Sequence, residues 1–133
     1  MKADLTKSQR RRIRDLAGTA YDRELSRELT ALEEHFGRWR RGEIDAHELS
    51  DQVHRFHQGP NRRLFLLYAG SDLDTAVASA IARGILSEDE ASPEIVDLLG
   101  VSIKYARENP RRATSGEESD GDPAVGGRSE PRR

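Results

Sequence analysis

The sequence predicts an all-α protein: a five- to six-helix bundle with one long N-terminal helix and a disordered C-terminal tail. Helix-start and helix-stop signals recur along the first 108 residues, and no segment alternates apolar and polar residues as a strand would. Apolar residues also recur at steps of three or four, which places them on one stripe of a single helix. This ladder consists of Tyr21, Leu25, Leu29, Leu32, Phe36 and Trp39.

The long helix is bounded by clear signals at both ends. Thr6 followed by Gln9 fits a capping box, and Gly42 after a run of arginines fits a helix C-terminus. An unbroken helix over residues 7–41 would span roughly 50 Å at 1.5 Å per residue. Gly18 is the expected place for a bend or a break, because glycine inside a helix costs about 1 kcal/mol relative to alanine.

A second and a third helix are expected next. Asp45 and Glu48 fit a capping box for the second, and Gly59-Pro60 is expected to end it. Residues 62–69 are apolar on nearly every side, so this third helix is predicted to lie at the centre of the core.

The remaining helices are marked by glycine, serine and proline. A fourth helix is expected from residue 71 to Arg83, closed by Gly84. A last helix is expected from the Ser92-Pro93 cap to Ala106. We therefore predict an all-helical domain over 1–108 and a disordered polar tail over 109–133.

Composition narrows the class of protein. The chain has 133 residues, which suits one domain, with 35% charged residues and a net charge of −2. Residues 1–70 carry 14 basic and 11 acidic side chains, whereas 71–108 carry 3 and 8. The absence of cysteine excludes disulfides and zinc–thiolate sites, and no apolar run is long enough to span a membrane. A cytoplasmic location and no cofactor are predicted.

Three residues of the second helix are candidate metal ligands. His47, Asp51 and His54 follow one another at i, i+4 and i+7, so they share a helix face, and their side chains suit zinc or a related metal. That face lies opposite Leu49 and Val53, so a solvated polar face is the favoured interpretation. A metal-dependent enzyme is the weakest alternative function.

A basic cluster in the first turns of the long helix is a candidate nucleic-acid contact. Arg10, Arg11, Arg12 and Arg14 oppose the helix macrodipole, which suggests phosphate contacts. Acidic residues follow at once, and Arg11 and Asp15 could pair at i, i+4. A nucleic-acid-associated regulator is therefore the second alternative.

The ladder is the third candidate, as a protein interface. Each of the later helices is expected to be too short to cover an unbroken first helix, and the part before Leu25 is expected to be the least covered. The predicted interface residues are Ile13, Ala17, Tyr21, Leu25 and Leu29. The favoured function is a small, non-catalytic interaction or regulatory protein that binds a protein partner through helices, with a homodimer as one form of that partner.

Overall fold

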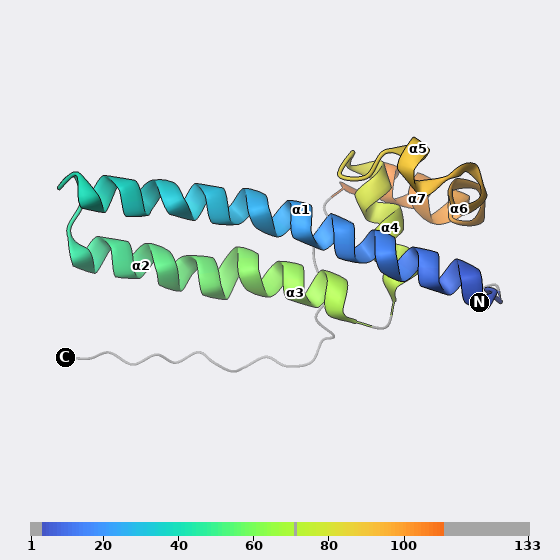
Figure 1. The fold of residues 1–133 in the computed structure, drawn as a ribbon, viewed down its shortest axis with the longest axis horizontal. Coiled ribbons are helices and arrows are strands. Elements are labelled where there is room, and N and C mark those ends of the chain that lie inside the picture. Colours follow the sequence, from blue (N-terminus) through green and yellow to red (C-terminus); the bar gives the residue numbers. More distant parts are fainter. Residues whose placement is uncertain (1–3, 71, 111–133) are drawn as a thin grey trace.

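The computed structural model describes residues 4–70 and 72–110, and all regular structure in this part of the chain is helical. The helix α1 (Lys7–Arg40) runs the length of the molecule, and the predicted all-α class with its long N-terminal helix is confirmed (Figure 1). Of the predicted tail, residues 111–133 lie outside the described residues. The described part contains no helix that combines the length and apolar character needed to cross a membrane.

Helix α1 is continuous through Gly18, so the expected break does not occur. The predicted capping box is present: the Gln9 amide donates to Thr6 Oγ1 at 3.0 Å, and the Thr6 amide donates to Gln9 Oε1 at 3.0 Å. Gly42 adopts φ +78° just after the helix, a conformation that glycine tolerates best. The free-energy cost of a glycine within the helix is small compared with the free energy gained by burying apolar residues on both sides of Gly18, among them Leu16 and Ala20.

The chain then turns back along α1 in one continuous arm. This arm consists of α2 (Ala46–Phe56), a π-helical turn η1 (His57–Asn61) and α3 (Arg62–Ala69). The prediction that Gly59-Pro60 ends the second helix is wrong. Proline lacks an amide donor and its ring would clash with a carbonyl one α-turn earlier, and the wider π turn accommodates both. The two arms form a long hairpin (Figure 1).

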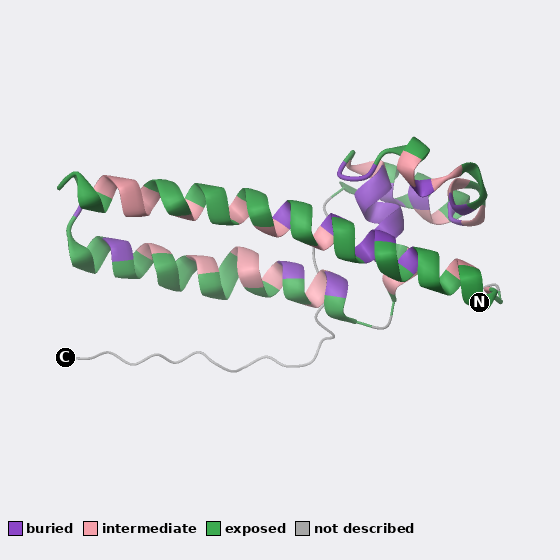
Figure 2. Cartoon of the chain, in the orientation of Figure 1, coloured by how far each residue is buried: buried purple, intermediate pink, exposed green. Residues whose placement is uncertain are grey.

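The centre of the core is α4 (Leu73–Ala82), not the third helix as expected. Every residue of α4 from Ala76 to Ile81 is buried, whereas α3 buries only Leu64 and Tyr68, and Phe65 is 56% exposed. Figure 2 shows the buried residues concentrated on α4. Its small side chains allow α1 and α7 to pack closely on it, while α3 contacts α1 and α4 through one face.

Three short helices complete the domain: α5 (Glu88–Ala91), α6 (Pro93–Leu98) and α7 (Gly100–Glu108). The predicted last helix is therefore two helices, separated at Leu99 (φ −98°, ψ 12°). The change of direction lets Ile95 and Ile103 both reach the core formed with α4 and the N-terminal half of α1. The hairpin projects from this compact end of the molecule (Figure 1).

Candidate functional site

A buried polar triad joins the hairpin to the compact end. Arg83, at the end of α4, donates to Glu24 of α1 through two nitrogens, at 2.7 Å and 3.0 Å. The Tyr68 hydroxyl of α3 donates to the same carboxylate at 2.5 Å. Arg83 Nε also donates to Ser79 Oγ at 2.9 Å. Glu24 is buried, and the guanidinium of Arg83 balances its negative charge within the protein.

The environment of the triad keeps Glu24 ionised. Burial alone would raise the pKa of Glu24, but the hydrogen bonds from Arg83 and Tyr68 and the charge of Arg83 outweigh it, so the pKa is lowered. Burial and the neighbouring Glu24 carboxylate raise the pKa of Tyr68, so its hydroxyl remains a donor. The Tyr68 ring stacks on Tyr21 with centroids 5.2 Å apart. The triad therefore fixes three helices relative to one another.

None of the three triad residues was among the site residues predicted from the sequence. A signal was present, because Glu24 lies three residues after Tyr21 and so places an acid beside the apolar ladder. An acid at such a position needs a partner. The partner, Arg83, lies 59 residues further along the chain.

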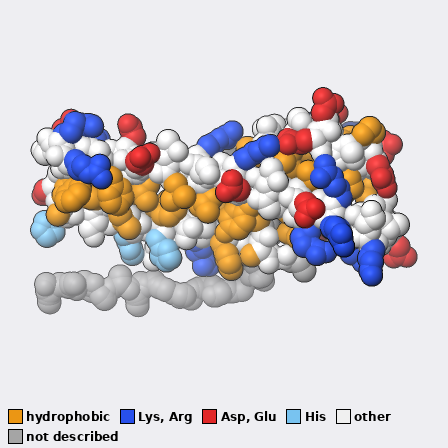
Figure 3. Space-filling model, in the orientation of Figure 1, with side chains coloured by type: hydrophobic (Ala, Val, Ile, Leu, Met, Phe, Trp, Pro, Cys, Tyr) orange, Lys and Arg blue, Asp and Glu red, His pale blue; other side chains and the backbone are white. Residues whose placement is uncertain are grey.

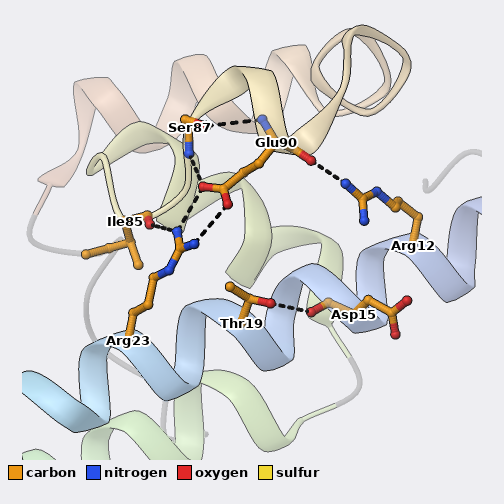
Figure 4. Close-up of polar contacts among 7 residues, drawn as sticks. All are labelled: Arg12, Asp15, Thr19, Arg23, Ile85, Ser87 and Glu90. Carbon is orange, nitrogen blue, oxygen red and sulfur yellow. Dashed lines mark hydrogen bonds and ion pairs between the residues drawn. The ribbon is translucent and has the colours of Figure 1, made fainter.

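A second cluster, the α5 clamp, ties α5 to the N-terminal half of α1 (Figure 4). Arg23 donates to both carboxylate oxygens of Glu90, at 2.8 Å and 2.9 Å, and to the Ile85 carbonyl at 2.8 Å. Glu90 also accepts from the Ser87 amide at 2.7 Å as part of a capping box. Arg12 donates to the Glu90 backbone carbonyl. These contacts make Glu90 the centre of the clamp.

The clamp predicts acid sensitivity. Hydrogen bonds from Arg23 and Ser87 lower the pKa of Glu90 from 4.5 to about 2. A carboxylate whose pKa is lower in the folded state stabilises the fold above its unfolded pKa, and this stabilisation is lost as the pH falls through its folded pKa. We expect the urea midpoint of the wild-type protein to fall between pH 4.5 and about 2. Glu90→Gln should show a shallower fall over the same range, and equal slopes would contradict the clamp.

The five predicted interface residues have different environments. Ile13 and Ala17 are buried in the chain's own core, Tyr21 and Leu25 are half-buried against it, and Leu29 is exposed. The expectation that the part of α1 before Leu25 is the least covered is therefore wrong. Helix α4 packs on that part, and α5 and α6 form hydrogen bonds with it. The least covered apolar residues lie toward the other end of α1.

These residues define a hairpin-end surface, comprising Leu29, Trp39 and Val53, which are 45%, 42% and 38% exposed. Two contacts, Tyr68 with Glu24 and Arg63 with Glu28, join the two arms, and along the chain these three residues lie between those contacts and the turn. Figure 3 shows a band of hydrophobic side chains between the two arms on the face in view. Histidines border the band on one side, and Lys or Arg side chains gather at its outer end (Figure 3).

The predicted basic cluster divides into two groups. Arg12 is directed to α5, where its guanidinium holds the Glu90 carbonyl. Arg10, Arg11 and Arg14 are exposed and make no ion pair or side-chain hydrogen bond within the described residues. The cluster is thus partly a structural contact and partly a free charged surface.

The candidate metal ligands are all exposed on α2. Asp51 pairs with Arg55, with 3.3 Å between its carboxylate and the guanidinium, rather than with His47 or His54. Among the described residues, no group of three or more His, Cys, Asp or Glu side chains is arranged to hold a metal ion.

The chain was compared with protein-family models, with curated proteins and with solved structures, and none of the three comparisons finds a match. The class that the fold defines is an all-α protein with a projecting helical hairpin.

Proposed function

We propose that this protein is a non-catalytic interaction module whose hairpin-end surface binds an amphipathic helix of a partner protein. The observation that carries the proposal is the exposure of Leu29, Trp39 and Val53 at the end of the hairpin farther from the core. Each of these large apolar side chains is more than one-third exposed, and burying them would favour association.

The shape of the hairpin favours a helix as the ligand. Two antiparallel helices with an apolar seam between them form the kind of groove in which an amphipathic helix binds. Leu29 and Trp39 are ten residues apart, which corresponds to about 15 Å along α1 and to nearly three turns of a bound helix. The ligand would thus need an apolar stripe of matching length.

The side chains beside the hairpin-end surface favour a ligand helix with acidic residues on either side of its apolar stripe. His47, His54 and His57 are exposed along α2 and η1, and Arg40 is exposed at the end of α1 with no ion pair within the described residues. These groups can donate hydrogen bonds to carboxylates. The cytoplasm is the proposed compartment, an expectation that rests on the sequence alone.

The test uses Trp39, which is the one tryptophan of the chain. A synthetic tryptophan-free amphipathic helix, with leucines at i, i+3, i+4 and i+7 and glutamate flanks, is titrated while Trp39 emission is recorded. We expect a blue shift as Trp39 becomes buried, and weaker binding by the same peptide with lysine flanks. Absence of a shift, or equal affinity for the two peptides, would refute the proposal.

Matched variants locate the surface. Leu29→Asp is expected to weaken binding of the glutamate-flanked peptide roughly tenfold or more, because a buried leucine is worth about 1.5–3 kcal/mol. Val101→Asp, at an 86% exposed residue of α7, should leave binding unchanged. Light scattering tests whether the partner is a second copy of the chain. If the wild-type protein is a dimer and Leu29→Asp is a monomer, the occupant of this surface is a second copy and not a separate protein.

A further inference from the structure

The face of α1 that carries the apolar ladder continues beyond the hairpin as a basic stripe. Stepping back from Tyr21 in the same three- and four-residue intervals leads through Gly18, Arg14 and Arg11 to Lys7. Arg10 lies beside them on the helix surface. We define the basic stripe as Lys7, Arg10, Arg11 and Arg14.

The second arm of the hairpin does not cover this part of the face. Helix α3 ends at Ala69, one residue after the Tyr68 that contacts Glu24, and the chain then leaves for α4. All four side chains of the basic stripe are exposed. Figure 3 shows Lys and Arg side chains gathered at this N-terminal end of the molecule.

The stripe is unusual among the basic residues because its charges are not compensated within the described part of the chain. Most other arginines there hold a carboxylate or a carbonyl, and the four stripe residues hold neither. The arginines with such contacts include Arg12, Arg23, Arg38, Arg41, Arg55, Arg63, Arg83 and Arg107. Like charges at i, i+3 and i+4 repel, and cations in the first turns of a helix oppose its dipole. An external anion would relieve both costs.

Contacts on the neighbouring faces of α1 hold the stripe in a fixed form. Gln9 Nε2 donates to Glu94 of α6 at 2.8 Å, and Arg12 donates to the Glu90 carbonyl of α5. The Thr6 capping box fixes the first turn. The helical segment that carries the four cations, roughly 10 Å long, is therefore held in place before any ligand binds.

The chemistry of the stripe favours phosphate in a duplex. Duplex DNA carries about one negative charge per 1.7 Å of its axis, so a helix segment of this length can meet several phosphates. Guanidinium groups bind phosphate in a bidentate way. The stripe contains no aromatic residue on which single-stranded bases could stack and no large apolar residue to anchor it in a lipid surface. We propose that the basic stripe binds the phosphate backbone of duplex nucleic acid without regard to sequence.

The test is fluorescence anisotropy with a labelled duplex DNA of mixed sequence, measured over a salt series with the full-length protein. Four phosphate contacts predict a slope of log K against log[salt] of about −3.6, and an affinity loss of roughly 150-fold between ~50 and ~200 mM salt. The variant Arg10→Gln/Arg11→Gln/Arg14→Gln should bind more weakly, with a slope near −0.9. These exposed side chains make no contact whose loss would unfold the protein.

A charge-matched control removes three other exposed cations: Arg27→Gln/Arg40→Gln/Lys104→Gln. It is expected to keep the wild-type slope. The proposal is overturned if the wild-type protein does not bind the duplex at ~50 mM salt, or if both triple variants lose affinity equally. It is also overturned if polyglutamate or anionic phospholipid vesicles displace the duplex at equal charge concentration, since the ligand would then be a different class of anion.

Discussion

Replacing Glu24 with alanine is expected to lower the free energy of unfolding by about 3 kcal/mol, because the substitution leaves the Arg83 guanidinium largely buried without a counter-charge. It also removes the acceptor for the Tyr68 hydroxyl. A loss of this size is a large share of the 5–15 kcal/mol typical of a small domain. Urea denaturation followed by circular dichroism measures it.

Two variants identify the cause of that loss. Glu28→Ala removes a half-exposed partner of Arg63, at 3.6 Å, and should cost no more than about 1 kcal/mol. The double variant Glu24→Leu/Arg83→Met removes both charges, and we expect it to recover much of the stability lost in Glu24→Ala. If Glu24→Ala costs no more than Glu28→Ala, the triad does not hold the hairpin as described.

Replacing Leu64 with alanine is expected to destabilise the protein by about 3 kcal/mol, within the range of 2–5 kcal/mol for a buried leucine. Leu64 is fully buried and is part of the core cluster that unites α1, α3 and α4. The substitution removes apolar contacts and leaves a cavity that the surrounding helices only partly fill.

The neighbouring residue is the matched control. Phe65 is the larger side chain but is 56% exposed, so Phe65→Ala should cost less than about 1 kcal/mol. Both variants are compared by urea denaturation under the same conditions. A reversed order of stabilities would mean that α3 is rotated relative to the orientation described.

The two proposed surfaces lie toward opposite ends of α1, and the helix between them is held rigidly. The basic stripe begins at Lys7, and the hairpin-end surface reaches Trp39 near the turn. Between them lie the α5 clamp at Arg23 and the triad at Glu24. The arrangement would allow one ligand at each end without the two competing for the same residues.

Features that depend on residues a few positions apart were predicted from the sequence. The Thr6–Gln9 capping box and the left-handed glycines Gly42 and Gly84 are as expected, and Asp45 caps α2 as predicted, although Glu48 does not complete a capping box there. Each involves backbone groups within one or two turns, so local residue types determine it. The stripe residues Arg10, Arg11 and Arg14 belong to the same class, since helical spacing alone places them together.

The sequence could not determine which apolar helix lies at the centre. Residues 62–69 and 73–82 are both rich in apolar side chains, and burial was decided by which of them packs between α1 and α7. The π turn at Pro60 decided that the second arm continues, so the arm runs along α1 from the hairpin turn to Tyr68 and leaves Leu29 and Trp39 partly exposed. The hairpin-end surface is what this arm leaves exposed.

The sequence by itself thus determined that this protein is helical, where the long first helix begins and ends, and which cations share a face. The tertiary structure alone decided that Arg12 binds α5, that Glu24 is neutralised by Arg83, and that Leu29 rather than Ile13 is exposed. The physical reason is distance along the chain. Caps and periodicity act within a few residues, whereas the ion pair of Arg83 with Glu24 spans 59 positions and the hydrogen bond from Arg12 to the Glu90 carbonyl spans 78.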